Sequence, residues 1–153
     1  MEHVTRLATP ADAEQLARLR WVMAAEEEAA LTQDEETFTA DFLAFVSTAQ
    51  SHGWTVFVAE VDGRLVSNIW VYEVPKVPRP DRYHHRAFGY MGSVYTLRDF
   101  RNQGIGAALL DEVVKWGRHR DLQLLIVWPS EEAPPFYRRA GFQEGTEEME
   151  LHL

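Results

Sequence analysis

Seven consecutive residues, Arg101-Asn102-Gln103-Gly104-Ile105-Gly106-Ala107, form the pattern in this chain with the clearest chemical meaning. They follow a predicted strand and open a predicted amphipathic helix. A helix N-terminus leaves backbone N–H groups unpaired and adds the positive end of the helix dipole. The two glycines remove side chains that would keep a diphosphate away from the backbone. The segment can therefore cradle a phosphate, although a Gly-x-Gly pair at a helix start also suits an ordinary tight turn.

Two better-known phosphate-binding turns do not fit this segment. A dinucleotide-binding turn needs a third glycine, at the position that Leu109 occupies, and it comes early in a βαβ unit. A P-loop needs Gly-Lys followed by Ser or Thr, and the chain has no such sequence. The sequence therefore favours a phosphate cradle of another kind.

A second motif stands further along the chain, as Pro135-Phe136-Tyr137-Arg138-Arg139-Ala140-Gly141-Phe142, with Ser130 seven residues before Tyr137. Together with the segment from Val94 to Gly106, it resembles the signature of the GNAT N-acetyltransferase superfamily. That signature is a strand, a short turn, Gln/Arg-x-x-Gly-x-Gly/Ala, and later Phe-Tyr-x-x-x-Gly-Phe. The resemblance covers the element order of residues 4–153. It departs from the family at Arg98, where the turn often carries proline, and at the pair Pro134-Pro135.

The resemblance implies acetyl-CoA as co-substrate. The backbone of residues 94–96 would pair with the pantetheine arm, and one amide there would polarise the thioester carbonyl. The amides of residues 102–107 would hold the pyrophosphate. Tyr137 would protonate the departing thiolate, because a thiol pKa of ~8.5 and a phenol pKa of ~10 are close enough for proton transfer. The expected cofactor-binding residues are Val94, Tyr95, Thr96, Arg101, Asn102, Gln103, Gly104, Ile105, Gly106, Ala107, Ser130 and Tyr137.

The general base is not fixed by the resemblance. Acetyl transfer needs a neutral amine, so a carboxylate or a chain of waters must accept a proton. Glu73, at the end of a predicted strand, is the first candidate for this catalytic role beside Tyr137, although a salt-bridged or solvated Glu73 is an equal alternative. Glu60, His84 and His85 are weaker candidates.

The resemblance implies that the acceptor docks against the first helices and the loop before the cradle strand. Aromatic and acidic side chains there suit a cationic, partly apolar amine, although such residues also serve as core and as solvated surface. A metal site is not expected, because the adjacent His84 and His85 have no carboxylate pattern to complete one. The candidate acceptor residues are Trp21, Glu26, Glu27, Glu28, Trp70, Tyr72, Glu73, Tyr83 and Tyr90.

The spacing of apolar residues along the chain predicts the helices and strands that must position these residues. Alternating or apolar runs predict strands, and apolar residues at helical spacing predict helices. Asp62-Gly63 is a strong hairpin turn signal. The fold class is therefore mixed α/β: one mostly antiparallel twisted sheet of about six strands flanked by about four helices, in a single domain over 1–153. Strands are expected over 4–7, 54–61, 64–72, 88–96, 122–128 (as a covered central strand) and 142–153, and helices over 10–28, 34–49, 104–119 and 134–141, with an irregular Pro-containing loop over 74–86.

Composition narrows the class of protein. The 153 residues are 46% apolar and 25% charged, as in ordinary globular proteins. The net charge of −9 disfavours nucleic acid and anionic membranes as partners. There is no cysteine, no apolar run that reaches the ~20 residues of a membrane span, and no signal-peptide pattern, so the cytoplasm is expected. Residues 1–73 carry a net charge of −9, whereas residues 98–120 carry +2. The basic segment suits an anionic ligand near the cradle, although charge alone favours chance clustering on a solvated helix.

The resemblance carried by the two motifs implies an acetyl-CoA-dependent N-acetyltransferase that moves an acetyl group to a primary amine of a small molecule, by direct transfer in a ternary complex. A non-catalytic acyl-CoA-binding or sensor module on the same fold is an alternative, as is a protein N-terminal or lysine acetyltransferase. A peptide-binding module that uses the prolines of residues 75–80 ranks last. The resemblance also allows a homodimer, and the acyl chain length stays open.

Overall fold

The computed structural model describes residues 2–27, 30–81, 84–145 and 149–153. Its centre is a five-stranded sheet in the order β1-β2-β3-β4-β5. The first four strands pair antiparallel, and β4 pairs parallel with β5. The predicted mixed, mostly antiparallel sheet is confirmed. The strands are β1 (Val4–Leu7), β2 (Trp54–Val61), β3 (Arg64–Pro75), β4 (Ala87–Thr96) and β5 (Leu125–Val127).

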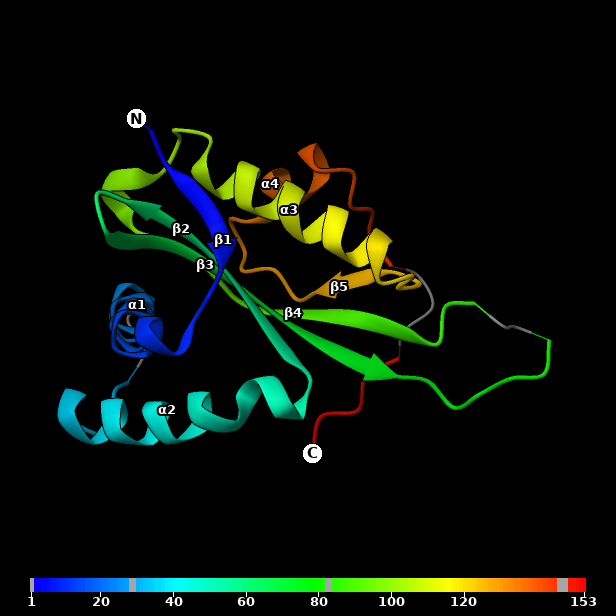
Figure 1. Cartoon of the computed structure of the whole chain (residues 1–153), viewed down its shortest axis with the longest axis horizontal. Helices are drawn as coiled ribbons and strands as arrows, with labels where there is room; N and C mark the ends of the chain where they lie inside the picture. Colours follow the sequence, from blue (N-terminus) through cyan, green and yellow to red (C-terminus); the bar gives the residue numbers. More distant parts are fainter. Residues whose placement is uncertain (1, 28–29, 82–83, 146–148) are drawn as a thin grey trace.

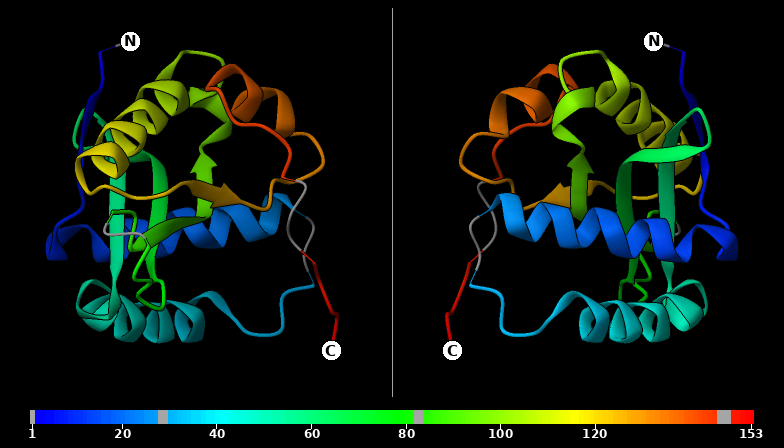
Figure 2. Two further views of the ribbon diagram at one scale, coloured as in Figure 1. Left: turned by 90° about the vertical axis from the view of Figure 1, so that its right-hand side faces the viewer. Right: turned by 90° about the vertical axis from the view of Figure 1, so that its left-hand side faces the viewer.

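Helices cover both faces of the sheet (Figure 1). The helices α3 and α4 lie on one face, and α1 and α2 lie on the other, as both views of Figure 2 also show. Each face has its own apolar core, because alternate residues of β3 point to opposite sides: Ile69 and Val71 pack in the core with α3, and Trp70 packs in the core with α1 and α2. The helices are α1 (Ala13–Glu26), α2 (Glu35–Ala49), α3 (Ile105–His119) and α4 (Pro134–Arg139).

Two predicted strands differ from the structure. The expected strand over 142–153 is wrong, because the described residues of that segment contain no strand. Gly145 interrupts its alternating pattern, and the apolar side chains of Met149 and Leu151 stay exposed rather than packing on a neighbour. The sheet accordingly has five described strands rather than about six.

The segment 122–128 is the second difference, because it is not a covered central strand. Only Leu125–Val127 is extended in the sheet, and β5 is an edge strand of the described sheet. Exposed Gln123 interrupts the apolar run on one side. Pro129, which has no backbone N–H to donate, follows it on the other side, and Trp128 is left exposed.

One ion-pair cluster fixes the start of α1 against the sheet edge. Arg6 of β1 donates to both carboxylate oxygens of Asp12, at 2.7 and 2.9 Å, and to Glu60 of β2 at 2.8 Å. Asp12 is buried just before α1 and also accepts from the backbone N–H of Thr9 at 2.7 Å. The hydrogen bonds from Arg6 and Thr9 outweigh the effect of burial and lower the pKa of Asp12 to about 2.

The lowered pKa of Asp12 makes stability depend on pH. A carboxyl group whose pKa is lower in the folded chain stabilises the fold above its unfolded pKa, and this contribution is lost as pH falls from about 4 through about 2. We expect Asp12→Asn to lower the free energy of unfolding at pH 7 by about 2 kcal/mol and to flatten its decline between pH 4 and pH 2. Urea unfolding at pH 7 and pH 3 measures both effects. Asp41→Asn, on the exposed face of α2, is the control and should change neither.

Candidate active site

The sheet opens along β4. Strand β5 pairs with β4 only from Gly89 to Met91, which faces Val127, whereas β4 continues to Thr96. The second half of β4 therefore pairs with β3 on one side and has no strand of the described sheet on the other. Unpaired backbone N–H and C=O groups at such an edge are available to an extended ligand. We call the open edge of β4 over residues 92–96 the split.

A bulge in β4 lies at the split and is held by buried polar side chains of β3. The register of β3 and β4 shifts between Asn68 and Trp70, and Ser93 has a φ of +48°. Asn68 is buried, and its Nδ2 donates to the carbonyl oxygen of Ser93. The hydroxyl of buried Ser67 lies 2.9 Å from the carbonyl oxygen of Tyr95. These side chains fix the path of β4 where its second neighbour is absent.

The turn after β4 leads into α3, whose first backbone N–H groups are not capped by a side chain. Asn102 and Gly104 have φ values of +60° and +81°, and α3 begins directly after them at Ile105. Gly104 is the N-cap residue, so no side chain there occupies the first amides of α3. The first N–H groups of α3 therefore lack a side-chain cap, which is what an anion-binding helix start requires.

Gly106 is the contact point between this cradle, β4 and α4. A Cβ atom placed on Gly106 would lie 3.2 Å from Oγ1 of Thr96 and 3.6 Å from the ring of Phe136. The absence of a side chain thus lets the first turn of α3 pack directly against the end of β4 and the start of α4. The residue after Phe136 is Tyr137, so the close contact also sets the place of that tyrosine.

Tyr137 is buried on the α3 side of the sheet. Its ring packs against Phe136 and Phe142, with centroids 5.1 and 5.5 Å apart, and it shares the core that holds Ile105 and Leu109. No other described residue hydrogen-bonds its hydroxyl group. Burial raises the pKa of Tyr137 to about 12, so the hydroxyl keeps its proton at physiological pH. Ser130 is exposed, and its carbonyl accepts from the N–H of Ala133 in the turn before α4.

Glu26, at the end of α1, joins α1 to the end of β4. It accepts a hydrogen bond from the hydroxyl of Tyr95 at 2.7 Å and from Arg101 at 2.5 Å. Burial would raise the pKa of Glu26, but these two donors outweigh it and lower that pKa. Arg101 also donates to the carbonyl of Thr96 at 2.9 Å, so its side chain folds back across the end of β4.

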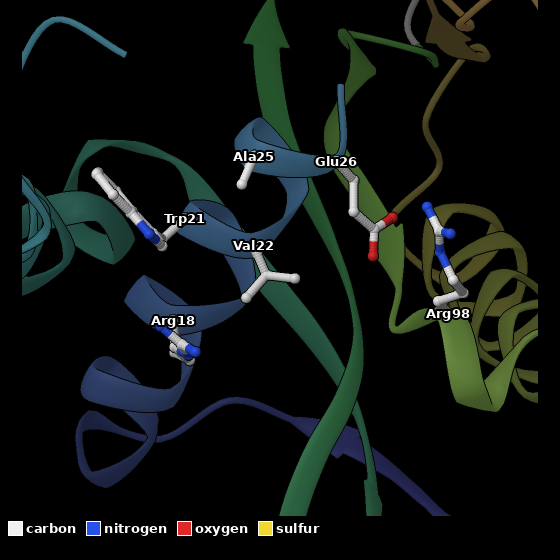
Figure 3. Close-up of a pocket in the computed structure, with 6 residues that line it drawn as sticks. All are labelled: Arg18, Trp21, Val22, Ala25, Glu26 and Arg98. Atoms are coloured by element: carbon white, nitrogen blue, oxygen red, sulfur yellow. The ribbon is translucent and has the colours of Figure 1, made fainter. Parts of the chain in front are cut away.

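A cavity of about 440 Å³ lies beside this cluster (Figure 3). Glu26 and Arg98 point toward one another across it, from α1 and from the turn after β4. Among the sequence-predicted acceptor residues, Glu26 and Trp21 line the cavity. Its lining residues are Arg18, Trp21, Val22, Ala25, Glu26 and Arg98.

Glu73 lies away from the cradle. Arg120, after the last residue of α3, donates to both of its carboxylate oxygens, at 2.7 and 2.9 Å. Glu73 faces Gly89, at the other end of β4 from Thr96, a separation of roughly 20 Å along the strand. The structure therefore brings Tyr137 and the cradle together but does not bring Glu73 to them.

The weaker candidate bases are also engaged elsewhere. Glu60 pairs with Arg6, and His84 and His85 lie within 3.4 Å of Asp121. Glu28 and Tyr83 lie outside the described residues. In the described part of the chain, no group of three or more His, Cys, Asp or Glu side chains is arranged to hold a metal ion, and no helix is long and apolar enough to cross a membrane.

Sequence reasoning missed the residues that hold the bulge. Ser67 and Asn68 are two polar residues in the otherwise apolar run from Leu65 to Val71, and both are buried. That interruption of an apolar strand was the available signal, because a buried polar side chain needs a partner.

Comparison with known proteins agrees with this geometry. The acetyltransferase (GNAT) family matches residues 14–142. Glucosamine 6-phosphate N-acetyltransferase of Trypanosoma brucei brucei is 30% identical over 98 residues, which are 64% of each chain. An uncharacterised N-acetyltransferase of Methanocaldococcus jannaschii is 28% identical over 96 residues, covering 58% of this chain and 38% of the relative. The chain thus spans less than two thirds of either relative's length.

Solved structures share the fold. A crystal structure of a predicted acetyltransferase with acetyl-CoA from Clostridium acetobutylicum has a TM-score of 0.79 at 21% identity, covering 99% of this chain and 96% of that one. An acetyltransferase of Trypanosoma brucei has a TM-score of 0.75 at 22% identity, covering 99% and 100%.

Removal of the Asn68 amide tests how the bulge is held. We expect Asn68→Leu to lower the free energy of unfolding by about 2 kcal/mol, because the partly buried carbonyl of Ser93 loses its donor. Amide exchange over residues 93–96 should also become faster, because the bulge is no longer fixed. Denaturant unfolding and native-state hydrogen exchange measure these effects. Ser47→Ala, on the exposed face of α2, is the control; an Asn68→Leu protein as stable as the wild type would contradict this role.

Proposed function

The chain belongs to the acetyltransferase (GNAT) family, as its motifs indicated, and we propose that it transfers the acetyl group of acetyl-CoA to the primary amine of a small molecule. The transfer is direct, with both substrates bound at once. The observation that carries this proposal is the meeting at Gly106 of the split along β4, the uncovered start of α3 and the helix α4, which carries buried Tyr137 next to Phe136.

These features suit the three parts of acetyl-CoA. The amides of residues 102–107 bind the pyrophosphate, because the start of α3 offers unpaired N–H groups and positive potential. The backbone of residues 94–96 pairs with the pantetheine arm along the split, as an added strand would. One amide there polarises the thioester carbonyl. Tyr137, in the core on the α3 side, and Ser130, in the turn before α4, are the residues proposed to serve the sulfur end of the cofactor.

The reaction balances as follows. The lone pair of the neutral amine attacks the carbonyl carbon, the C–N bond forms and the C–S bond breaks. The sulfur leaves with the electron pair of that bond and receives a proton from the hydroxyl of Tyr137. The amide nitrogen loses one proton to water, and Tyr137 regains a proton from solvent. The products are the acetylated amine and free CoA.

Tyr137 is the residue whose role is most directly tested. We expect Tyr137→Phe to lower kcat by about 100-fold while the Kd of acetyl-CoA changes less than about twofold, because only the proton donor is removed. With the pKa of Tyr137 at about 12, kcat of the wild type should show no decline from this group up to pH 10. Thiol release measured from pH 6 to pH 10, and calorimetry of acetyl-CoA, provide the two readouts.

The outcome also separates the enzyme from a sensor. A sensor on this fold binds acetyl-CoA but releases no thiol with any amine, so Tyr137→Phe would have no turnover to lose. Unchanged kcat in an active Tyr137→Phe protein would contradict the proton-donor role.

The amine's proton passes to water rather than directly to Glu73 in this proposal. Glu73 is held by both hydrogen bonds from Arg120, at the far end of α3 from the cradle. We expect Glu73→Gln to leave kcat within about twofold of the wild type. Steady-state thiol release measures this, with Glu60→Gln as the matched control. A 100-fold loss of kcat with unchanged acetyl-CoA affinity would instead establish Glu73 as the base.

The net charge of −9 supports a cationic small-molecule amine as acceptor. The trypanosomal relative is named for glucosamine 6-phosphate, so that phosphorylated amine belongs among the acceptors tested. The first experiment is calorimetric titration with acetyl-CoA, with free CoA and a dinucleotide as controls. Selective binding of acetyl-CoA and CoA supports the cradle, and no binding would overturn the proposed function.

A further inference from the structure

A row of aromatic side chains crosses the sheet on the face opposite Tyr137. Trp54, Tyr72 and Tyr90 face one another in register on β2, β3 and β4, so all three project from the same face. Tyr90 is paired with Ile126 of β5, and Trp128 follows two residues later. Ring centroids are 5.2 Å apart for Trp54 and Tyr72, 6.3 Å for Trp54 and Tyr90, and 5.1 Å for Tyr90 and Trp128. These four residues are the aromatic row.

The two ends of the row have different surroundings. Trp54 packs against Trp70 and Phe45, so it belongs to the core under α2. At the other end Trp128 is 61% exposed, and its described ring contact is with partly buried Tyr90. Keeping an indole in water forgoes the favourable burial of a large apolar surface. The exposed end of the row is therefore available to a ligand.

This exposed end borders the split. Gly92 is the first residue of β4 beyond the pairing with β5, and the ring of Tyr90 lies over it. A Cβ atom on Gly92 would lie 3.4 Å from that ring and 3.5 Å from the Tyr90 hydroxyl oxygen. Tyr137 belongs to the core on the α3 side, whereas the row continues the core of α1 and α2. The row and Tyr137 thus flank the split from opposite faces.

We infer that Tyr90 and Trp128 form the acceptor subsite, and that the acceptor is a primary amine that carries an aromatic group. This inference rests on the proposed function and narrows its substrate class. An aromatic acceptor stacks on the exposed ring of Trp128, and its ammonium group in the encounter complex is attracted by the electron-rich ring faces. The acidic chain favours such a cation over a phosphorylated amine. The amine then reaches the thioester from one face, and the sulfur departs toward Tyr137 on the other.

The test compares phenethylamine, spermidine and glucosamine 6-phosphate as acceptors in thiol release with acetyl-CoA. The wild type should show the highest kcat/KM with phenethylamine. Trp128→Ala and Tyr90→Leu should each raise KM for this amine at least tenfold, with the Kd of acetyl-CoA within twofold. Phe38→Leu, which alters a partly buried aromatic residue of α2 away from the split, is the matched control and should leave KM unchanged. Thermal unfolding checks that each variant folds.

A binding measurement keeps the subsite separate from the catalytic proposal. Calorimetry of phenethylamine with the CoA-saturated and the ligand-free protein should show binding that Trp128→Ala weakens at least tenfold. If the amine binds at this place but no thiol is released, the proposed function fails and the subsite stands. The subsite is overturned if spermidine or glucosamine 6-phosphate is the best acceptor. It is also overturned if neither variant changes the Kd or the KM of phenethylamine. In both cases the acetyltransferase proposal stands.

Discussion

The site depends on one strand that loses a neighbour halfway along its length. Strand β4 pairs with β5 over Gly89–Met91 and then continues to Thr96 with a partner on only one side. A strand edge exposes backbone groups that need partners, and such edges invite pairing with another chain. Here the open stretch is short, and the bulge at Ser93, fixed by buried Asn68, gives it a shape that a regular strand would not match. The same arrangement that discourages aggregation leaves room for one extended ligand.

Close contact at Gly106 ties the split to the other parts of the site. Thr96 and Phe136 lie so near Gly106 that a Cβ atom there would be 3.2 Å from the Thr96 hydroxyl oxygen and 3.6 Å from the Phe136 ring, so the absence of a side chain lets these elements pack closely. The cradle for an anion, the open strand and Tyr137 are therefore placed by one packing contact among elements whose positions the two cores already fix. No long side chain has to reach across the site, so little conformational entropy is lost when the ligand is bound.

Sequence reasoning predicted those features that depend on neighbours along the chain. The Asp62-Gly63 hairpin and the long helices follow from local periodicity and turn chemistry. The family was indicated by the resemblance of two motifs, which also lie in local sequence. It did not predict features that depend on partners from distant segments. Only three residues of the apolar segment 122–128 lie in the sheet, and residues 142–145 and 149–153 form no strand. Glu73 accepts a hydrogen bond from Arg120, which is 47 residues away in the chain. The register shift at Asn68 is likewise a property of two strands together, which alternation within one strand does not encode.

The two faces of the sheet carry different parts of the candidate site. On the α3 side, the packing of α3 and α4 sets the positions of the cradle and Tyr137, which we propose to serve the acyl donor. On the α1 and α2 side, the exposed end of the aromatic row lies outside the core, so substitutions at Trp128 cost the fold little. In the proposed arrangement, acceptor preference can therefore change on one face while the residues proposed for the donor and the leaving thiol stay intact on the other. Such a division follows from a sheet that is open at one strand, because only there do ligands from both faces reach the same atoms.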